Sequence, residues 1–221
     1  MKNTIIAIDG PSAVGKGTIS RKIADYYGFE YLDTGIFYRS IAYLTLKNNI
    51  SLEEENKIID IAKNLDIIIK RFSVFNKEEE ITNLIRSNEV NAIVSQISSI
   101  KEIRLIVNDL IRNHVANKNY VIDGRDITSN VYPDARFKFY LDCDADERAR
   151  RRFKQNQEMG IECSFEEIYD NLKSRDYNDK TKGYGALTIT SDAIIINTTN
   201  DTIEETIKKI INIIGSEIKW I

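Results

Sequence analysis

The chain has 221 residues, of which 42% are hydrophobic and 29% are charged, and its formal net charge is −3. That length suits one large domain or a core with small insertions, whereas the small net charge argues against a surface that coats nucleic acid. No apolar run approaches the ~20 residues of a membrane-spanning helix, and the two cysteines lack CxxC spacing, so we expect a cytoplasmic protein without zinc or disulfides.

The most informative segment lies near the N-terminus, where a glycine-rich turn follows a predicted buried strand at residues 4–8. The turn and the start of the next helix read Gly10, Pro11, Ser12, Ala13, Val14, Gly15, Lys16, Gly17 and Thr18. This is the spacing of a P-loop, in which backbone N–H groups, a helix N-terminus and a lysine bind phosphate oxygens. We predict an ATP site at residues 10–18. A glycine-rich turn without a ligand is the weaker interpretation, because strand, loop and helix occur in the required order.

Apolar runs that resemble strands recur between amphipathic segments, at residues 29–32, 120–122, 137–141 and 193–196. This alternation predicts an α/β fold of the P-loop NTPase type, with a five-stranded parallel sheet covered by helices on both faces. Helix starts are predicted where a hydroxyl and a glutamate have capping-box spacing, at residues 51 and 54, 164 and 167, and 202 and 205. We expect the last helix to end near Ile214.

Residues 66–82 interrupt the alternation with two β-like pieces, 67–72 and 73–75, and an acidic turn, 76–82. A helix with Val90, Ile93, Val94 and Ile97 on one face follows, and a longer helix is expected over residues 101–115. We therefore predict a core formed by residues 1–39 and 101–221, with an inserted subdomain at residues 40–100.

Polar residues follow two of the predicted strands. Asp33, Thr34 and Arg39 follow the second strand, and residues 123–126 follow the third. In open α/β sheets ligands bind at the carboxyl ends of the strands, so these segments and the P-loop should face one crevice. Arg39 and Arg125 suit a phosphate, because a guanidinium binds two phosphate oxygens at once. The candidate Mg²⁺ ligands, directly or through water, are Thr18, Asp33 and Asp123. Arg125 and Asp126 could instead form a local ion pair.

An arginine-rich run, residues 147–152, follows the strand that ends near Leu141. Arg148 and Arg152 share one helical face with Arg151 beside them, so a lid at residues 144–163 could bring their guanidiniums onto transferring phosphates. A solvated charged face is the alternative. The single histidine, His114, is expected to be a surface or helix-packing residue, and phosphoryl transfer does not require a histidine base.

Four segments give the chain a specific resemblance to a known family. LDTGIFYR, VNAIVSQIS with IKEIR after it, VIDGRDITSNVYPDARFKFYLD and LKSRDYNDK are similar to bacterial cytidylate kinases, over essentially the whole chain. The GKGT sequence of the P-loop is also typical of nucleoside monophosphate kinases. Adenylate kinases share the P-loop but lack the DGRD segment.

The resemblance implies that ATP, with Mg²⁺, phosphorylates CMP and dCMP bound at the inserted subdomain. It assigns the cytosine edge to Ser95, Arg104 and Asp126, because the carboxylate can accept from the exocyclic amine while the other two donate to the ring acceptors. Without the resemblance, Ser95 and Arg104 would be interpreted as surface residues. The resemblance further places Asp179 at the ribose, braced by Arg175. The implied catalytic residues are Lys16, Arg148, Arg151 and Arg152, and the acceptor contacts include Thr34, Arg39 and Arg125.

The chain departs from the family pattern at two positions. Lys182 stands where a further arginine is common, and a lysine keeps the positive charge but lacks the bidentate geometry of a guanidinium. Asn197 stands where an aspartate is common. Another small-molecule P-loop kinase, such as one acting on shikimate, and a non-catalytic nucleotide sensor are the alternative functions. A helicase is disfavoured by the short chain and balanced charge. We expect a monomer whose partners are ATP and CMP or dCMP, without nucleic acid or membrane.

Overall fold

The computed structural model describes residues 3–70, 73–158 and 160–217. The chain divides into two compact units. The first contains Met1–Leu32, Asn117–Lys182 and Ala186–Ile221, and the second contains Asp33–Ala116 and Gly183–Gly185. Because two separate segments complete the second unit, residues distant in sequence meet in it.

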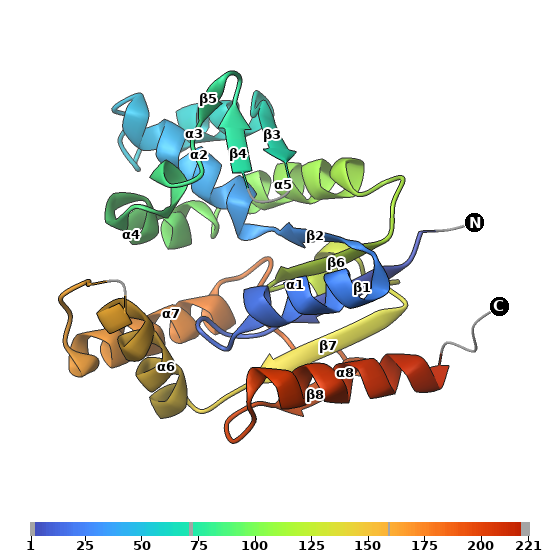
Figure 1. Cartoon of the computed structure of the whole chain (residues 1–221). Coiled ribbons are helices and arrows are strands. Elements are labelled where there is room, and N and C mark those ends of the chain that lie inside the picture. The colour runs from blue at the N-terminus through green and yellow to red at the C-terminus, as the bar shows by residue number, and fades with distance from the viewer. Residues whose placement is uncertain (1–2, 71–72, 159, 218–221) are drawn as a thin grey trace. The chain divides into compact units, whose positions relative to one another are not determined.

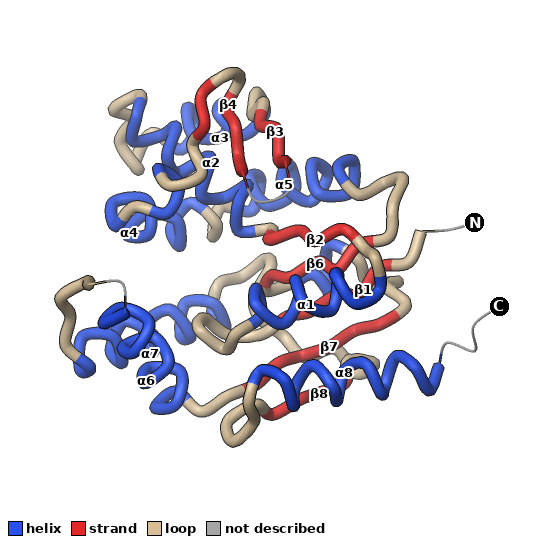
Figure 2. Tube along the Cα trace, in the orientation of Figure 1, coloured by secondary structure: helices blue, strands red, loops and turns tan. Residues whose placement is uncertain are grey.

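A five-stranded sheet forms the centre of the first unit (Figures 1 and 2). Its strands are β1 (Ile5–Asp9), β2 (Glu30–Asp33), β6 (Tyr120–Gly124), β7 (Phe137–Asp142) and β8 (Ile194–Asn197), in the order β2-β6-β1-β7-β8. The pairings of β1 with β6 and β7, and of β7 with β8, are parallel. Every residue of β1 is buried, as its nearly continuous apolar run predicts for a central parallel strand. All five predicted strands are confirmed.

The helices of the first unit are α1 (Lys16–Tyr27), α6 (Ala145–Glu158), α7 (Phe165–Thr181) and α8 (Ile203–Glu217), with a short π-helical turn, η2 (Ile127–Val131). Side chains of α1 and α8 pack against β1 and β7 in the main core, which includes Ile8, Ile19, Ile23, Phe139 and Ile210. The helix-flanked parallel sheet confirms the predicted fold class.

Two of the three capping predictions are confirmed and one is wrong in detail. The boxes at residues 164 and 167 and at residues 202 and 205 form reciprocally before α7 and α8. Ser51, by contrast, does not cap a helix, because α3 (Glu55–Lys63) begins four residues later with Glu54 at its N-cap. The Ser51 hydroxyl accepts from the N–H of Glu53, while its own N–H donates to the Glu54 carboxylate, so the pair closes the preceding turn. The last helix extends to Glu217, beyond the predicted end.

The second unit consists of α2 (Gly35–Lys47), α3, α4 (Asn88–Ile97) and α5 (Lys101–His114), with a short 3₁₀ turn, η1 (Leu84–Arg86). It also contains an antiparallel sheet of β3 (Ile67–Lys70), β4 (Ser73–Asn76) and β5 (Glu79–Glu80). The predicted β-like pieces are therefore strands, although residues 71–72 of the first piece lie outside the described residues. Val74, Ile81 and Ile85 form a small core with Ile36 of α2.

The second unit extends beyond the predicted insertion, 40–100, at both ends. The reason is packing: α2 contacts α3, α4 and η1, and α5 contacts α3, so both flanking helices belong with the insertion. Within the part of the chain that the structure describes, none of the helices has the length and apolar character to cross a membrane.

Candidate functional site

The predicted phosphate cradle lies between β1 and α1. A Cβ atom at Gly10 would lie 2.3 Å from the carbonyl oxygen of Leu141 in β7, so only glycine allows this close approach of loop and strand. Gly15 occupies the N-cap of α1, and among the described residues no side chain caps that helix end. The first N–H groups of α1 are therefore available to phosphate oxygens.

Lys16 is turned onto its own loop in this structure. Its Nζ donates to the carbonyl oxygens of Gly10 and Pro11, each at 2.7 Å, and the residue is only 8% exposed. Burial and the positive charge of Arg125 lower the pKa of Lys16 to about 7. These carbonyls thus hold the ammonium within the cradle, where phosphate oxygens would be better partners for its charge.

Arg125 lies near Lys16 and is held by Asp179. The Arg125 Nε donates to Asp179 Oδ2 at 2.7 Å, and Lys182 Nζ donates to Oδ1 at 3.1 Å. Burial alone would raise the pKa of Asp179, but the two cations lower it to about 2. Arg125 therefore pairs with Asp179, whereas the alternative interpretation paired it with Asp126. The bracing of Asp179 by Arg175 stays a prediction. Lys182, one of the two predicted departures from the family pattern, therefore has an ionic role through Asp179.

Asp9 has a bracing role that the sequence analysis missed. It is fully buried at the end of β1, and its carboxylate accepts from the N–H of Ile127 at 3.0 Å, the N–H of Thr128 at 2.8 Å and the Thr128 hydroxyl at 2.7 Å. Burial raises the pKa of Asp9, although these hydrogen bonds oppose the shift. Asp9 thereby fixes the backbone that follows Asp126, itself buried at 3% exposure. An acidic residue ending the central strand was the available signal.

The candidate metal ligands fall in different places. Asp123 is buried beside the start of α1, where a Cβ on Gly17 would lie 3.8 Å from its Oδ2, and it accepts from the Tyr31 hydroxyl at 3.1 Å. Thr18 is exposed in the first turn of α1. Over residues 3–70, 73–158 and 160–217, no three acidic, histidine or cysteine side chains form a metal-binding group. The oxygens of Thr18 and Asp123 suit Mg²⁺ that is carried mainly by a nucleotide.

Asp33, the third metal candidate, is engaged in the second unit. Its carboxylate pairs with Arg39 at 2.5 Å and with Arg86 at 3.5 Å, and it accepts from the N–H of Gly35 at 2.9 Å. Burial by itself raises the pKa of Asp33, but the positive charges of the two arginines outweigh this effect, so the pKa is lowered overall. These cations make Asp33 a weaker metal candidate than Asp123. Arg86 is a neighbour of the predicted phosphate-binding Arg39 that no sequence signal indicated.

The arginines of the predicted lid differ in exposure. Arg148 is only 4% exposed, so a wholly solvated face is excluded for this run. Its guanidinium donates to the carbonyl oxygens of Cys143 at 2.9 Å and Ser12 at 3.1 Å and forms a bidentate pair with Asp176, at 3.1 and 2.5 Å. Because Ser12 belongs to the P-loop, Arg148 ties α6 and α7 to the phosphate cradle.

Arg151 and Arg152 are less buried than Arg148. Arg151 donates to Glu147 at 2.9 Å and to the carbonyl oxygen of Thr198 at 2.7 Å, whereas Arg152 is exposed and donates to Gln155 at 3.1 Å. Of the three, Arg152 therefore has the side chain most accessible to a ligand. The catalytic roles of all three stay predictions.

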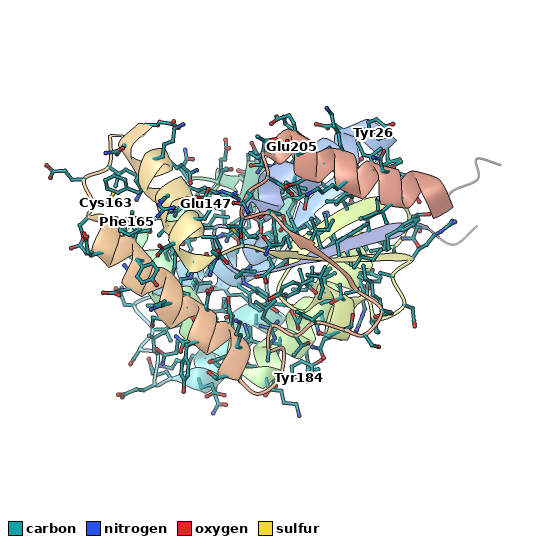
Figure 3. All side chains as sticks on the ribbon, turned by 90° about the horizontal axis from the view of Figure 1, so that it is seen from below. Tyr26, Glu147, Cys163, Phe165, Tyr184 and Glu205 are labelled. Atoms are coloured by element: carbon teal, nitrogen blue, oxygen red, sulfur yellow. The ribbon has the colours of Figure 1, made fainter. Side chains whose placement is uncertain are left out.

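The two helices that carry these residues pack through a small apolar cluster. Ala149 of α6 contacts Ile168 and Leu172 of α7 in a cluster that also includes Ala13 of the P-loop and Phe165. Figure 3 shows Phe165 at the start of α7, with α6 alongside. The predicted lid is therefore continuous with the P-loop through side-chain packing as well as through Arg148.

The predicted base-reading residues of the second unit lie on α4 and α5. Arg104 is 2% exposed, its Nη1 donates to the carbonyl oxygen of Ser98 at 2.8 Å, and its guanidinium lies 5.2 Å from the ring centroid of Tyr38. The alternative of a surface arginine is therefore wrong. Ser95 is half-buried on α4. Burying an arginine is costly unless its donors are used, so this position indicates a specific role.

The predicted site residues thus fall into two sets. The first unit holds residues 10–18, Asp123, Arg125, Asp126, Arg148, Arg151, Arg152, Arg175 and Asp179, and the second holds Asp33, Thr34, Arg39, Ser95 and Arg104. Thr34 is buried at the N-cap of α2. Tyr38 is buried within the second unit, and His114 is exposed with a ring contact to Phe37.

The glycine-rich cradle at the end of a central parallel strand, its buried lysine and the arginines near it define a P-loop kinase. A family model described as cytidylate kinase matches residues 6–216. The chain belongs to the cytidylate kinase family and is therefore a nucleoside monophosphate kinase.

Similar proteins agree with this assignment, and a solved structure shares the fold. The chain is 41% identical to a cytidylate kinase of Caldanaerobacter subterraneus subsp. tengcongensis, over 97% of this chain and 96% of that protein. It is 38% identical to a cytidylate kinase of Caldicellulosiruptor bescii, over 99% of both. The crystal structure of an uncharacterized protein from Eubacterium ventriosum is similar in fold, with a TM-score of 0.54, 14% identity and coverage of 97% of this chain and 99% of that one.

Proposed function

We propose that this enzyme transfers the γ-phosphoryl group of ATP directly and in line to CMP and to dCMP. The observation that carries the proposal is the proximity of Lys16 and Arg125, whose positive charge lowers the pKa of Lys16. One cation belongs to the cradle for the donor phosphates, and the other is suited to an acceptor phosphate. Phosphoryl transfer depends mainly on alignment and on neutralising charge, which two adjacent cations supply.

The acceptor nucleotide is bound through its phosphate and sugar as follows. Arg39 and Arg125 bind its α-phosphate with Thr34 nearby, since each guanidinium can donate to two oxygens. Asp179, positioned by Arg125, accepts from the ribose hydroxyls, with Arg175 beside it on α7. The hydrogen bond between Arg125 and Asp179 thus joins the two subsites.

The base is read by Ser95, Arg104 and Asp126. Asp126 accepts from the exocyclic amine of cytosine, while Arg104 and Ser95 donate to its ring acceptors. Uracil would put a carbonyl opposite the carboxylate, which disfavours UMP. The burial of Arg104 and of Asp126, at 2% and 3% exposure, supports this role, because buried polar groups discriminate strongly against ligands that leave them unpaired.

The donor side combines the P-loop, Mg²⁺ and the arginines of α6. Residues 10–18 bind the phosphates of ATP, and Lys16 exchanges its loop carbonyls for β- and γ-phosphate oxygens. Thr18 and Asp123 would hold Mg²⁺, directly or through water, and the bound ion supplies charge neutralisation on the phosphates. Arg151 and Arg152 stabilise the transferring group when the lid closes, while Arg148 holds α6 on the P-loop.

Initial rates of ADP formation from MgATP test this proposal. CMP, dCMP, UMP, AMP, GMP and shikimate are compared under identical conditions, with an acceptor-free control and a chelator control. We expect a strong preference for CMP and dCMP, and a loss of turnover by orders of magnitude in Lys16→Met with the fold retained. Preference for another acceptor would overturn the base assignments, and ADP formation independent of acceptor would favour a sensor or an ATPase.

Cytoplasmic location and a monomeric state belong to the same proposal. Cys143 and Cys163 are free cysteines, as is usual in a reducing compartment. Light scattering with and without ATP and CMP tests the monomeric state, which a stable dimer at working concentration would contradict.

A further inference from the structure

A three-residue segment after α7 belongs to the second unit, although the residues on both sides of it belong to the first. The segment, Gly183–Gly185, contains Tyr184, whose hydroxyl accepts from Asn108 of α5 at 3.4 Å (Figure 3 labels Tyr184). The N–H of Leu187 then donates to the carbonyl oxygen of Asp179 at 2.7 Å, which closes the loop onto the end of α7. The segment is thus held at α5, the helix that carries Arg104.

Gly185 lies directly against the guanidinium of Arg104. A Cβ at this position would lie 1.8 Å from Arg104 Nε, 2.4 Å from Cζ and 2.7 Å from Nη2. Its φ of +76° lies in the left-handed region, which glycine adopts without steric cost. Any larger residue would therefore have to displace the guanidinium.

The same guanidinium is bounded by two other groups. Its Nη1 donates to the carbonyl oxygen of Ser98 at 2.8 Å, and the ring of Tyr38 lies 5.2 Å from its Cζ. With Gly185 on a further side and an exposure of 2%, the planar group has little room to rotate. Packing from three separate parts of the chain therefore restricts its orientation.

We propose that Gly185 is a positioning residue that fixes the direction of the Arg104 guanidinium and thereby sets the preference of the enzyme for cytosine. The inference rests on the proposed function, in which Arg104 donates to the ring acceptors of the base. Cytosine N3 accepts a hydrogen bond whereas uracil N3 carries a hydrogen, so a displaced guanidinium loses more with CMP than with UMP. Gly185 acts only through Arg104 and does not itself contact the nucleotide.

Gly185→Ala tests the inference against two matched glycine variants. Gly28→Ala introduces alanine at a similar φ, +66°, with nothing within 4 Å, and Gly183→Ala introduces it in the same segment, also with nothing within 4 Å. We expect Gly185→Ala to raise the KM for CMP by about 10- to 100-fold, the range for losing a hydrogen bond to a charged group. The ratio of kcat/KM for CMP to that for UMP should fall, and the KM for ATP should stay within about twofold of the wild type, because the cradle is unchanged. Both control variants should keep the wild-type ratio.

The double variant with Arg104→Ala separates positioning from a general structural role. Once the guanidinium is absent, Gly185→Ala should change the KM for CMP by less than about twofold, whereas independent effects would multiply. Multiplying effects, or wild-type selectivity in Gly185→Ala, would overturn the inference. If Gly185→Ala alone fails to fold, the double variant tests whether the clash is with the guanidinium. A double variant that folds as Arg104→Ala does supports this clash, whereas a double variant that fails to fold contradicts it. A wild-type enzyme without CMP preference would instead refute the proposed function.

Discussion

The substitution Asp179→Asn tests the ionic cluster that Asp179 forms with Arg125 and Lys182 at the end of α7. Burial alone would raise the pKa of Asp179, but Arg125 and Lys182 lower it to about 2, from an ordinary value of 3.8. The side chain is 13% exposed, so solvent screens these interactions only in part. A shift of this size corresponds to about 2.5 kcal/mol of unfolding free energy, which asparagine, similar in shape to the protonated acid, should remove at neutral pH.

The pH dependence of this loss has a definite sign. Because the folded pKa lies below the unfolded one, the ionised carboxylate stabilises the fold at pH values above about 4, and its contribution disappears as the pH falls toward 2. The difference between wild type and Asp179→Asn should therefore be about 2.5 kcal/mol at pH 7 and about 1.3 kcal/mol at pH 3. Destabilisation of the variant should thus shrink with acid.

Urea unfolding followed by far-ultraviolet circular dichroism at pH 7, 5 and 3 measures both quantities. Asp109→Asn is the matched control, because Asp109 pairs with Arg112 at 3.2 Å but is 74% exposed, and its loss should be small at every pH. A loss in Asp179→Asn that is equally large at pH 7 and pH 3 would show that shape, not charge, holds the cluster. An unfolding free energy of Asp179→Asn equal to that of the wild type at pH 7 would refute the claim that the ionised carboxylate stabilises the fold.

Three further changes test other parts of the site. Arg148→Ala should lower the urea midpoint by an amount equivalent to about 3–5 kcal/mol, because Asp176 loses its buried partner, whereas Arg150→Ala, 66% exposed on the same helix, should unfold like the wild type. Asp9→Asn should lower kcat/KM for CMP about tenfold in initial-rate assays, because the amide nitrogen of the asparagine would face one of the three donors that Asp9 accepts from and residues 126–128 would shift. An unchanged kcat/KM would show that Asp9 does not position these residues. Arg152→Gln should lower kcat without moving the urea midpoint, because the side chain is exposed, and wild-type kcat would exclude it from catalysis.

Local patterns predicted the elements of this protein well. The strands are short apolar runs, and the P-loop has a fixed spacing. Two capping boxes could be recognised as a hydroxyl residue followed three positions later by a glutamate. Each signal lies within a few residues, where backbone geometry follows directly from residue type. The Ser51 prediction failed for the same local reason, because a turn can use the same hydroxyl and carboxylate as a helix start.

The environment of the candidate site was less predictable, because it depends on contacts between distant residues. Arg148 meets Ser12 across 136 positions of the sequence, and Asp9 meets Thr128 across 119. No periodicity indicates such pairs, so the burial of Arg104 and Arg148 and the bracing by Asp9 emerged only from the structure. The family resemblance named Arg104 without explaining its environment, and the packing of α2 and α5 decided the unit boundaries.

The two arginines proposed to bind the acceptor phosphate share a feature that bears on how the enzyme binds nucleotides. Arg39 pairs with Asp33, and Arg125 pairs with Asp179. A carboxylate presents two oxygens to a guanidinium much as a phosphate does, so each pair holds its arginine in a geometry suited to phosphate. Less side-chain entropy is then lost when a nucleotide binds, although some attraction to the phosphate is offset by the neighbouring acid. Lys16 shows the same arrangement with neutral carbonyl oxygens, which compete less strongly for its charge. The cradle lysine should therefore move to the nucleotide phosphates, whereas Arg125 keeps Asp179 and shares its remaining donors.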